Sequence, residues 1–326
     1  MRSSTDQADT PTRPSRPRYT RKRSGPLRVL APLLAVLVLL VLITESLALG
    51  SRTLSPEEVW QGLLAYDNSV ASKVVWGLRI HRTILAIVVG ASLAVAGVVM
   101  QALTRNPLAE PGILGVNAGA SLAVVAAIGG LGLTSVNQYL PFAFAGAAAA
   151  AVLVHVMARR SADAGPARLV LAGVALGASL SSITGTITMY NSKAFDSYRF
   201  WVVGSLENRK LEVLLWVAPF LAVGLVLALA SAHSLNALAL GDEQATALGV
   251  NLAVVRGGAF VAITLLCGAA TAAAGPISFI GLVIPHVVRL LVGADQRRLL
   301  AWSVAAGAGL LLAADVAGRL LVRPTE

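Results

Sequence analysis

Apolar runs recur along most of the chain and are separated by shorter polar or basic connections. Runs of about 20 apolar residues are long enough to cross a bilayer as helices, whereas a β-barrel would alternate polar and apolar residues over about ten positions. The pattern therefore predicts an all-α fold, a polytopic membrane helical bundle. We expect about nine spans, over residues 29–49, 83–103, 113–128, 140–158, 169–190, 211–230, 252–274, 277–291 and 299–321.

The composition excludes a soluble domain. Of the 326 residues, 56% are hydrophobic and 13% charged, and the mean hydropathy is +0.75, whereas about a quarter of the residues in soluble domains are charged. The net charge of +10 would suggest nucleic acid as the partner of a soluble protein. Here the basic residues gather between the apolar runs, where they set topology. We therefore expect membrane lipid, and no nucleic acid, around this chain.

The basic residues also divide and orient the chain. Residues 1–28 are rich in Arg, Pro, Ser and Thr and predict a disordered basic arm, followed by a transmembrane domain over 29–326. The positive-inside rule places the N-terminus in the cytoplasm. The run at 29–49 is too long for a secretory signal and no clear cleavage site follows it, so we expect an uncleaved first span. In the polar connection 50–77, residues 55–58 (SPEE) predict a helix start.

The fifth predicted span carries small residues at every fourth position, namely Gly173, Gly177, Ser181 and Gly185. Small residues at this spacing form a flat ridge on a helix, which suits close helix packing or the lining of a path. Packing is the simpler interpretation for any one of them. Hydroxyl side chains gather near the outer end of the same helix, so the helix as a whole is a candidate for pathway lining.

Candidate chemistry within the spans is sparse. An ion-coupled carrier usually needs acidic groups at mid-membrane depth, but Glu45 and Glu110 lie near span ends, and Asp315 is one helical turn from Arg319 and can pair with it. The chain has no G-x-x-x-x-G-K-[ST] phosphate loop, and its four histidines are scattered without the spacing of a zinc helix. We therefore predict no catalytic residues, no metal site and no bound cofactor on this chain.

Four long motifs follow one another in a specific order. They are LRIHRT (78–83), QALTRNPLAEPGILGVNAGA (101–120), LALGDEQATALGV (238–250) and GPISFIGLVIPHVVRLLVGADQRRLL (275–300). Together they closely resemble the permease subunits of ABC importers for iron–siderophore complexes, haem and vitamin B12. The likeness extends from about residue 27 to the end of the chain.

The resemblance implies a function and a set of partners. In that family two permeases, identical or different, form a dimer around one central path in the bacterial cytoplasmic membrane. Two cytoplasmic ABC ATPase subunits bind ATP and Mg²⁺, and an extracytoplasmic substrate-binding protein or lipoprotein docks outside. The leading hypothesis is a non-enzymatic permease for a ferric-siderophore-type chelate. Haem or vitamin B12 cargo is the alternative within the family, and an ion-coupled secondary transporter is the alternative outside it.

The third motif is similar to the segment that couples such permeases to their ATPase, and it occupies about 235–251 in this chain. Asp242, Glu243 and Gln244 are expected to offer polar contacts, and Leu240 and Leu248 apolar anchors. The full set assigned to this contact is Leu240, Gly241, Asp242, Glu243, Gln244, Leu248 and Gly249. An ordinary solvated loop is the alternative interpretation.

The first motif implies a docking edge for the binding protein. By position, Arg79, Arg82 and Arg319 match the arginines that the family uses to hold acidic residues of that partner, and a guanidinium suits this because it forms two hydrogen bonds to a carboxylate. Interfacial snorkelling without a partner is the alternative. The family usually has Pro where His81 stands, at the expected turn into the second span. It also normally has a tenth span, which predicts that this chain is truncated or a nine-span variant.

Overall fold

The computed structural model describes residues 27–50, 53–64, 69–159, 166–207 and 209–321. The predicted basic arm lies outside these residues except for its last two positions, and so do residues 322–326. Within the described part, every regular element is a helix. The all-α prediction is confirmed.

Nine helices correspond one to one with the nine predicted spans. They are α1 (Leu27–Ala48), α4 (Ile80–Thr104), α5 (Val116–Leu131), α6 (Val136–Arg159), α7 (Pro166–Tyr190), α9 (Leu211–Leu238), α11 (Leu252–Ala274), α12 (Ile280–Val292) and α13 (Gln296–Leu321). Between them lie short helices: α2 (Pro56–Leu64), α3 (Val70–Val74), the π-helix η1 (Val75–Arg79), the 3-10 helix η2 (Pro111–Leu114), α8 (Ser192–Val202) and α10 (Asp242–Ala247). Among the described residues, seven helices are long and apolar enough to cross a membrane, while α5 and α12 are apolar but shorter.

Two expected boundaries were wrong. The helix that carries the second span is continuous from Val70 to Thr104, so no turn precedes it at His81. Similarly, α9 continues to Leu238, eight residues beyond the predicted end of the sixth span. Both errors have the same cause, because a helix is held by its backbone hydrogen bonds and does not stop where its side chains become polar.

The helix start expected at residues 55–58 is confirmed in α2. The backbone N–H of Ser55 donates to Glu58 Oε2 at 2.7 Å, and the N–H of Glu58 donates to Ser55 Oγ at 3.2 Å. This reciprocal pair is a capping box, which satisfies two backbone donors that the first turn of a helix leaves free.

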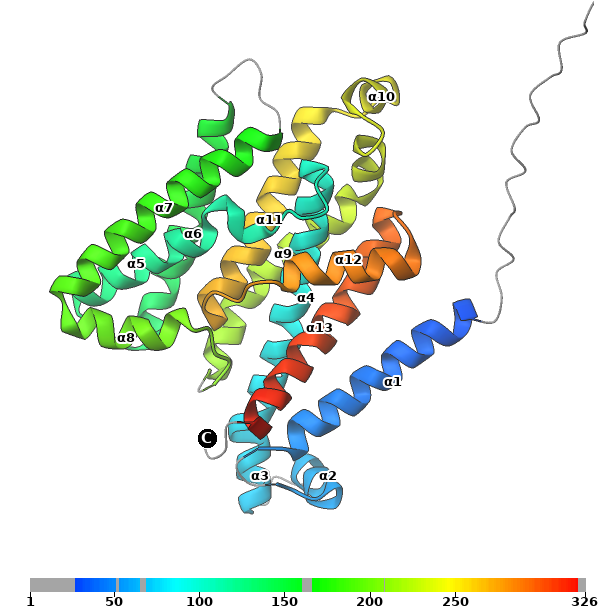
Figure 1. Cartoon of the computed structure of the whole chain (residues 1–326). Helices are drawn as coiled ribbons and strands as arrows, with labels where there is room; N and C mark the ends of the chain where they lie inside the picture. The colour runs from blue at the N-terminus through cyan, green and yellow to red at the C-terminus, as the bar shows by residue number, and fades with distance from the viewer. Residues whose placement is uncertain (1–26, 51–52, 65–68, 160–165, 208, 322–326) are drawn as a thin grey trace, which may run out of the picture.

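The bundle is built around α4. This helix packs against α13, α11, α12 and α9, whereas α5, α6, α7 and α8 form a second group. Helix α11 joins the two groups because it contacts α4 and α9 on one side and α5 and α6 on the other. Figure 1 shows α10 at one end of the bundle and α2 and α3 at the opposite end, with α1 diverging from the bundle toward its N-terminal end.

Three helix crossings are formed by pairs of glycines, one from each helix: Gly90 with Gly307, Gly97 with Gly281, and Gly119 with Gly146. At each crossing, a methyl group on either glycine would meet the backbone or a side chain of the facing helix. In lipid, helices gain little from burying apolar surface, so the close backbone approach that small residues allow supplies much of the packing energy. The first two pairs therefore set how closely α4 packs against α13 and α12, and the third sets how closely α5 packs against α6.

A buried glutamine completes the contact between α4 and α12. Pro285 lies inside α12 and has no backbone N–H, which leaves the carbonyl of Gly281, four residues earlier, without its helical donor. Gln101 Nε2 faces that carbonyl at 3.4 Å and the carbonyl of Leu282 at 3.3 Å, while Gln101 Oε1 accepts a hydrogen bond from Arg289 Nη2 at 3.0 Å. One side chain on α4 thus compensates for the proline in α12.

The glycine crossing makes a testable prediction. Gly97→Ala should lower the free energy of unfolding by about 1–3 kcal/mol, because the added methyl group overlaps the Gly281 carbonyl and forces α12 outward. The matched control is Gly257→Ala on α11, where the methyl group meets no atom within 4 Å and should be neutral or stabilising by up to about 1 kcal/mol through helix propensity. Unfolding of the detergent-solubilised protein measures both, and equal stabilities for the two variants would contradict the crossing geometry.

Candidate functional site

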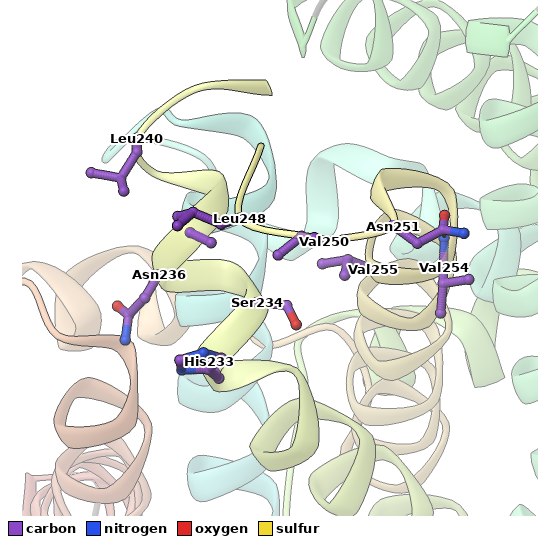
Figure 2. A pocket seen from close by; sticks show the side chains of 11 residues that line it. His233, Ser234, Asn236, Leu240, Leu248, Val250, Asn251, Val254 and Val255 are labelled. Carbon is purple, nitrogen blue, oxygen red and sulfur yellow. Dashed lines mark hydrogen bonds between the residues drawn. The ribbon is translucent and has the colours of Figure 1, made fainter. Parts of the chain in front are cut away.

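The expected coupling segment forms one end of the molecule. It consists of the last turn of α9, the short helix α10 and the loop into α11. Leu240 and Leu248 are 58% and 65% exposed, and they border a groove of about 650 Å³ between α9 and α11 that Figure 2 shows from close by. Two large apolar side chains therefore lie at this end of the bundle, and no other part of the described chain covers them.

The polar residues of this segment behave differently from one another. Glu243 and Gln244 are exposed on α10, as expected for residues that face a partner. The carboxylate of Asp242 instead points back to the bundle, where it pairs with Arg105 and, at 2.6 Å, with Arg256. Partial burial raises the pKa of the Asp242 carboxyl, but the hydrogen bonds and charges of Arg256 and Arg105 outweigh this effect and hold the pKa below its ordinary value.

Glycines flank α10 on both sides. Gly241 has φ of 113° and Gly249 has φ of 81°, values that other residues rarely adopt. The chain can therefore turn sharply into and out of a helix of only six residues. The positive φ values at these two turns explain why the motif has glycine at both positions.

A second groove, of about 490 Å³, runs along α7 and contains three of the four small residues singled out there. Gly173 packs directly against the backbone of η2 at Ile113, whereas Gly177 faces open space and Ser181 is exposed. Gly185 also faces open space but does not line this groove. Packing therefore explains Gly173, while the other three residues remain available to line a path.

Polar side chains from outside α7 complete this groove. They are Glu110, Asn117, Ser121, Tyr198 and Ser278. Glu110 Oε1 accepts a hydrogen bond from the backbone N–H of Phe279 at 2.8 Å, at the start of α12, and Asn117 Oδ1 accepts one from the Thr271 hydroxyl at 3.0 Å. In the sequence, Glu110 is recognisable only as an acid near the end of a predicted span. Its partner lies 169 residues further along the chain, so no local pattern could indicate it.

At the opposite end of the bundle, two of the three expected docking arginines are buried. Arg79 is 2% exposed, and its Nη1 donates to the carbonyls of Leu47 and Ala48 at 2.7 and 2.9 Å. Arg319 is 7% exposed and donates to the carbonyls of Ser46 and Leu49 at 3.0 and 2.9 Å. The last carbonyls of a helix have no intrahelical donor and carry partial negative charge. Both arginines therefore stabilise the C-terminal end of α1.

The third arginine belongs to the same cluster through an acid. Asp315 pairs with Arg319 at 2.9 Å, which confirms the pairing one helical turn apart, and it also pairs with Arg82 at 2.9 Å. The Asp315 side chain is 6% exposed and that of Arg82 is 16% exposed. The structure thus brings all three arginines together and gives each a partner within the chain, and their role in docking stays a prediction.

Comparison with known proteins places the chain among transporters. The model of the FecCD transport family matches residues 37–326. The ferric enterobactin transport system permease of Escherichia coli (strain K12) is 43% identical over 88% of this chain and 86% of its own length. The Fe(3+)-citrate import system permease YfmD of Bacillus subtilis (strain 168) is 39% identical over 94% and 92%.

The vitamin B12 import system permease of Yersinia enterocolitica is 41% identical over 89% of this chain and 85% of its own length. A solved structure described as an inward-facing conformation of an ABC transporter of metal-chelate type superposes with a TM-score of 0.79 at 28% identity, over 90% of this chain and 92% of that one. The family match includes the coupling segment, the groove along α7 and the arginine cluster. This chain belongs to the FecCD transport family.

Proposed function

We propose that this chain is the membrane permease of an ATP-driven ABC importer that carries a ferric-siderophore-type chelate across the bacterial cytoplasmic membrane. The observation that carries the proposal is the 43% identity to a ferric enterobactin permease over most of both chains. The ferric citrate relative supports an iron chelate as cargo. The chain itself is a non-enzymatic transmembrane subunit, and ATP with Mg²⁺ is bound and hydrolysed by a partner.

The groove along α7 supports a path shared with a second permease. Within one chain, α7 leaves much of its surface uncovered, including apolar residues such as Leu171 and Val174 and the small residues Gly177 and Ser181. A second copy, or a related permease, would cover this face and close the groove into a path. Small residues and hydroxyls along such a path suit a bulky polar cargo, because they leave room and offer hydrogen bonds without a fixed charge.

Features at the two ends of the bundle support the proposal of two other partners. At the end formed by α10, the exposed Leu240 and Leu248 are the apolar contacts for a cytoplasmic ATPase, with Glu243 and Gln244 beside them. At the other end, the binding protein would dock near the arginine cluster. Since Arg79 and Arg319 donate their hydrogen bonds to the end of α1, they would act by fixing the shape of this edge. Arg82 is the least buried of the three arginine side chains.

Uptake measurements test the cargo. The permease, reconstituted with its ATPase and binding protein in proteoliposomes, should accumulate a ⁵⁵Fe-labelled catecholate or citrate chelate in the presence of ATP, and should accumulate haem and cobalamin much more slowly. Omission of the ATPase should abolish uptake. Uptake that persists without the ATPase would refute an ABC importer, and selective uptake of cobalamin would refute the iron cargo.

The groove generates a steric prediction. Gly177→Leu should abolish uptake because its side chain projects into the space between α7 and the groove wall. Gly257→Leu is the control, since Gly257 also faces open space but does not line this groove. Initial uptake rates at matched protein levels measure the effect. Equal rates for the two variants would contradict a path along α7.

The arginine cluster generates a stability prediction. Arg79→Met keeps much of the side-chain bulk but removes the donors to the end of α1, where hydrogen bonds from a charged group contribute about 1.5–3 kcal/mol each. The apparent unfolding temperature in detergent should therefore fall by at least about 5 °C. Lys73→Met, an exposed cation six residues earlier, should leave it unchanged. Similar unfolding temperatures for both variants would show that Arg79 does not hold α1.

A binding measurement separates an effect on docking from an effect on stability. If Arg82 contacts the binding protein, Arg82→Gln should weaken the affinity of the permease for that protein more than Arg79→Met does, although Arg79→Met lowers stability more. The affinity is measured with the purified binding protein and the permease in nanodiscs. An affinity that is unchanged by Arg82→Gln would remove Arg82 from the docking edge.

A further inference from the structure

Arg105 lies where α4 ends and reaches two other helices. Its backbone is left-handed, with φ of 49° and ψ of 32°, at the C-cap position that glycine usually occupies. Its Nε donates to the carbonyl of Leu238 at the end of α9 at 3.0 Å, and its Nη2 pairs with Asp242 at the start of α10. A residue other than glycine is sterically disfavoured in this conformation because its Cβ approaches the following carbonyl oxygen. The turn therefore holds an arginine at a conformational cost, and that arginine connects α4 to both α9 and α10.

Asp242 is shared between two arginines. Its Oδ1 pairs with Arg105 and its Oδ2 pairs with Arg256 of α11 at 2.6 Å, so both carboxylate oxygens are used. The pairs are partly exposed, with side-chain exposures of 36–42%, and isolated pairs of this kind contribute little to stability. Their effect here is to connect α10 to the end of α4, since Arg105 and Asp242 are 137 residues apart in the chain.

The rest of α10 is attached loosely. It packs against α9 and α11, its neighbours in the chain, mainly through the buried Ala245. The turns at both of its ends are glycines with positive φ, Gly241 and Gly249, at which the backbone rotates with little steric resistance. A push on α10 could therefore be absorbed at these two turns. The ion pairs of Asp242 oppose such rotation because they fix the start of α10 to α4 and α11.

We propose that Asp242 is the joint through which a displacement of α10 reaches α4, the helix around which the bundle is packed. This rests on the proposed function, in which α10 seats against an ATPase. Asp242 is a positioning residue that faces its own bundle, while Leu240, Glu243, Gln244 and Leu248 face the partner. When the ATPase moves α10, Arg105 carries the movement to the end of α4, and Arg256 carries it to α11.

The experiment uses the assembled complex of permease and ATPase in nanodiscs, in a Cys267→Ser background. A Gln244→Cys cross-link to the ATPase reports seating of α10. Spin labels at Leu108→Cys, just beyond α4, and Leu171→Cys on α7 report the distance change on addition of the ATP analogue AMP-PNP with Mg²⁺. The variant is Asp242→Asn, which keeps the shape and removes the charge. Asp196→Asn on α8 is the matched control, since the same substitution there breaks an exposed pair of aspartate and arginine, with Arg199, away from α10 (Figure 1).

We expect Asp242→Asn to keep the cross-link and the ATPase rate but to lose most of the AMP-PNP-driven distance change. ATP-driven uptake should fall by about tenfold, within the usual range of coupling between two sites. Arg105→Gln should reproduce this result and tests the same joint if Asp242→Asn does not accumulate in the membrane. Asp242→Glu, which keeps the charge, should recover part of the distance change, and Asp196→Asn should behave like the complex without a charge substitution.

Three results would overturn the inference or its basis. A full distance change and normal uptake in Asp242→Asn and Arg105→Gln would show that α4 moves without the joint. Loss of the cross-link in Asp242→Asn, with the cross-link retained in Asp196→Asn, would show that Asp242 contacts the ATPase directly. Absence of a cross-link in the complex that carries Gln244→Cys and no charge substitution would instead refute the seating of α10, and with it the proposed function on which the joint depends.

Discussion

Every backbone carbonyl or N–H that lacks a helical partner in a lipid-embedded protein must find one within the protein, because the hydrocarbon offers none. Several of the long-range contacts in this structure answer that requirement. Arg79 and Arg319 cap the end of α1, and Gln101 approaches the carbonyl that Pro285 frees in α12. Glu110 accepts the backbone N–H at the start of α12. These contacts join elements distant in the chain at the points where a helix begins, ends or is interrupted.

The same requirement explains how the chain uses its buried charges. The carboxylate of Asp315 could accept a proton or coordinate a cation, but two guanidinium groups lie within salt-bridge distance of it. One of these, that of Arg319, also caps α1. A buried ion pair contributes little net stability yet is costly to break. The cluster therefore keeps its charges paired and suits a rigid edge more than a relay. Such an edge agrees with the proposed function, in which a separate ATPase supplies the energy.

The sequence predicted the bundle well and its contacts poorly, for a physical reason. Hydropathy is a local property, so each predicted span overlaps a helix, and the capping box of α2 could be recognised from four consecutive residues. The predicted end of α9 and the predicted start of the helix that carries the second span were wrong, because backbone hydrogen bonding continues into polar sequence. The internal partners of the three arginines could not be predicted, because folding alone brings residues 46–49 to Arg79 and Arg319, and Asp315 to Arg82.

Asp242 shows how a side chain that a family resemblance assigns to a partner contact can also have partners within its own chain. The motif placed the residue correctly in an exposed segment, and an acid in such a segment is most simply expected to face a partner. The carboxylate turns inward because two arginines, at the ends of helices far apart in sequence, converge on it. Glycines on both sides of α10 would otherwise leave the helix free to pivot. If this segment couples the permease to an ATPase, as proposed, such an internal attachment is as necessary as a surface for the partner.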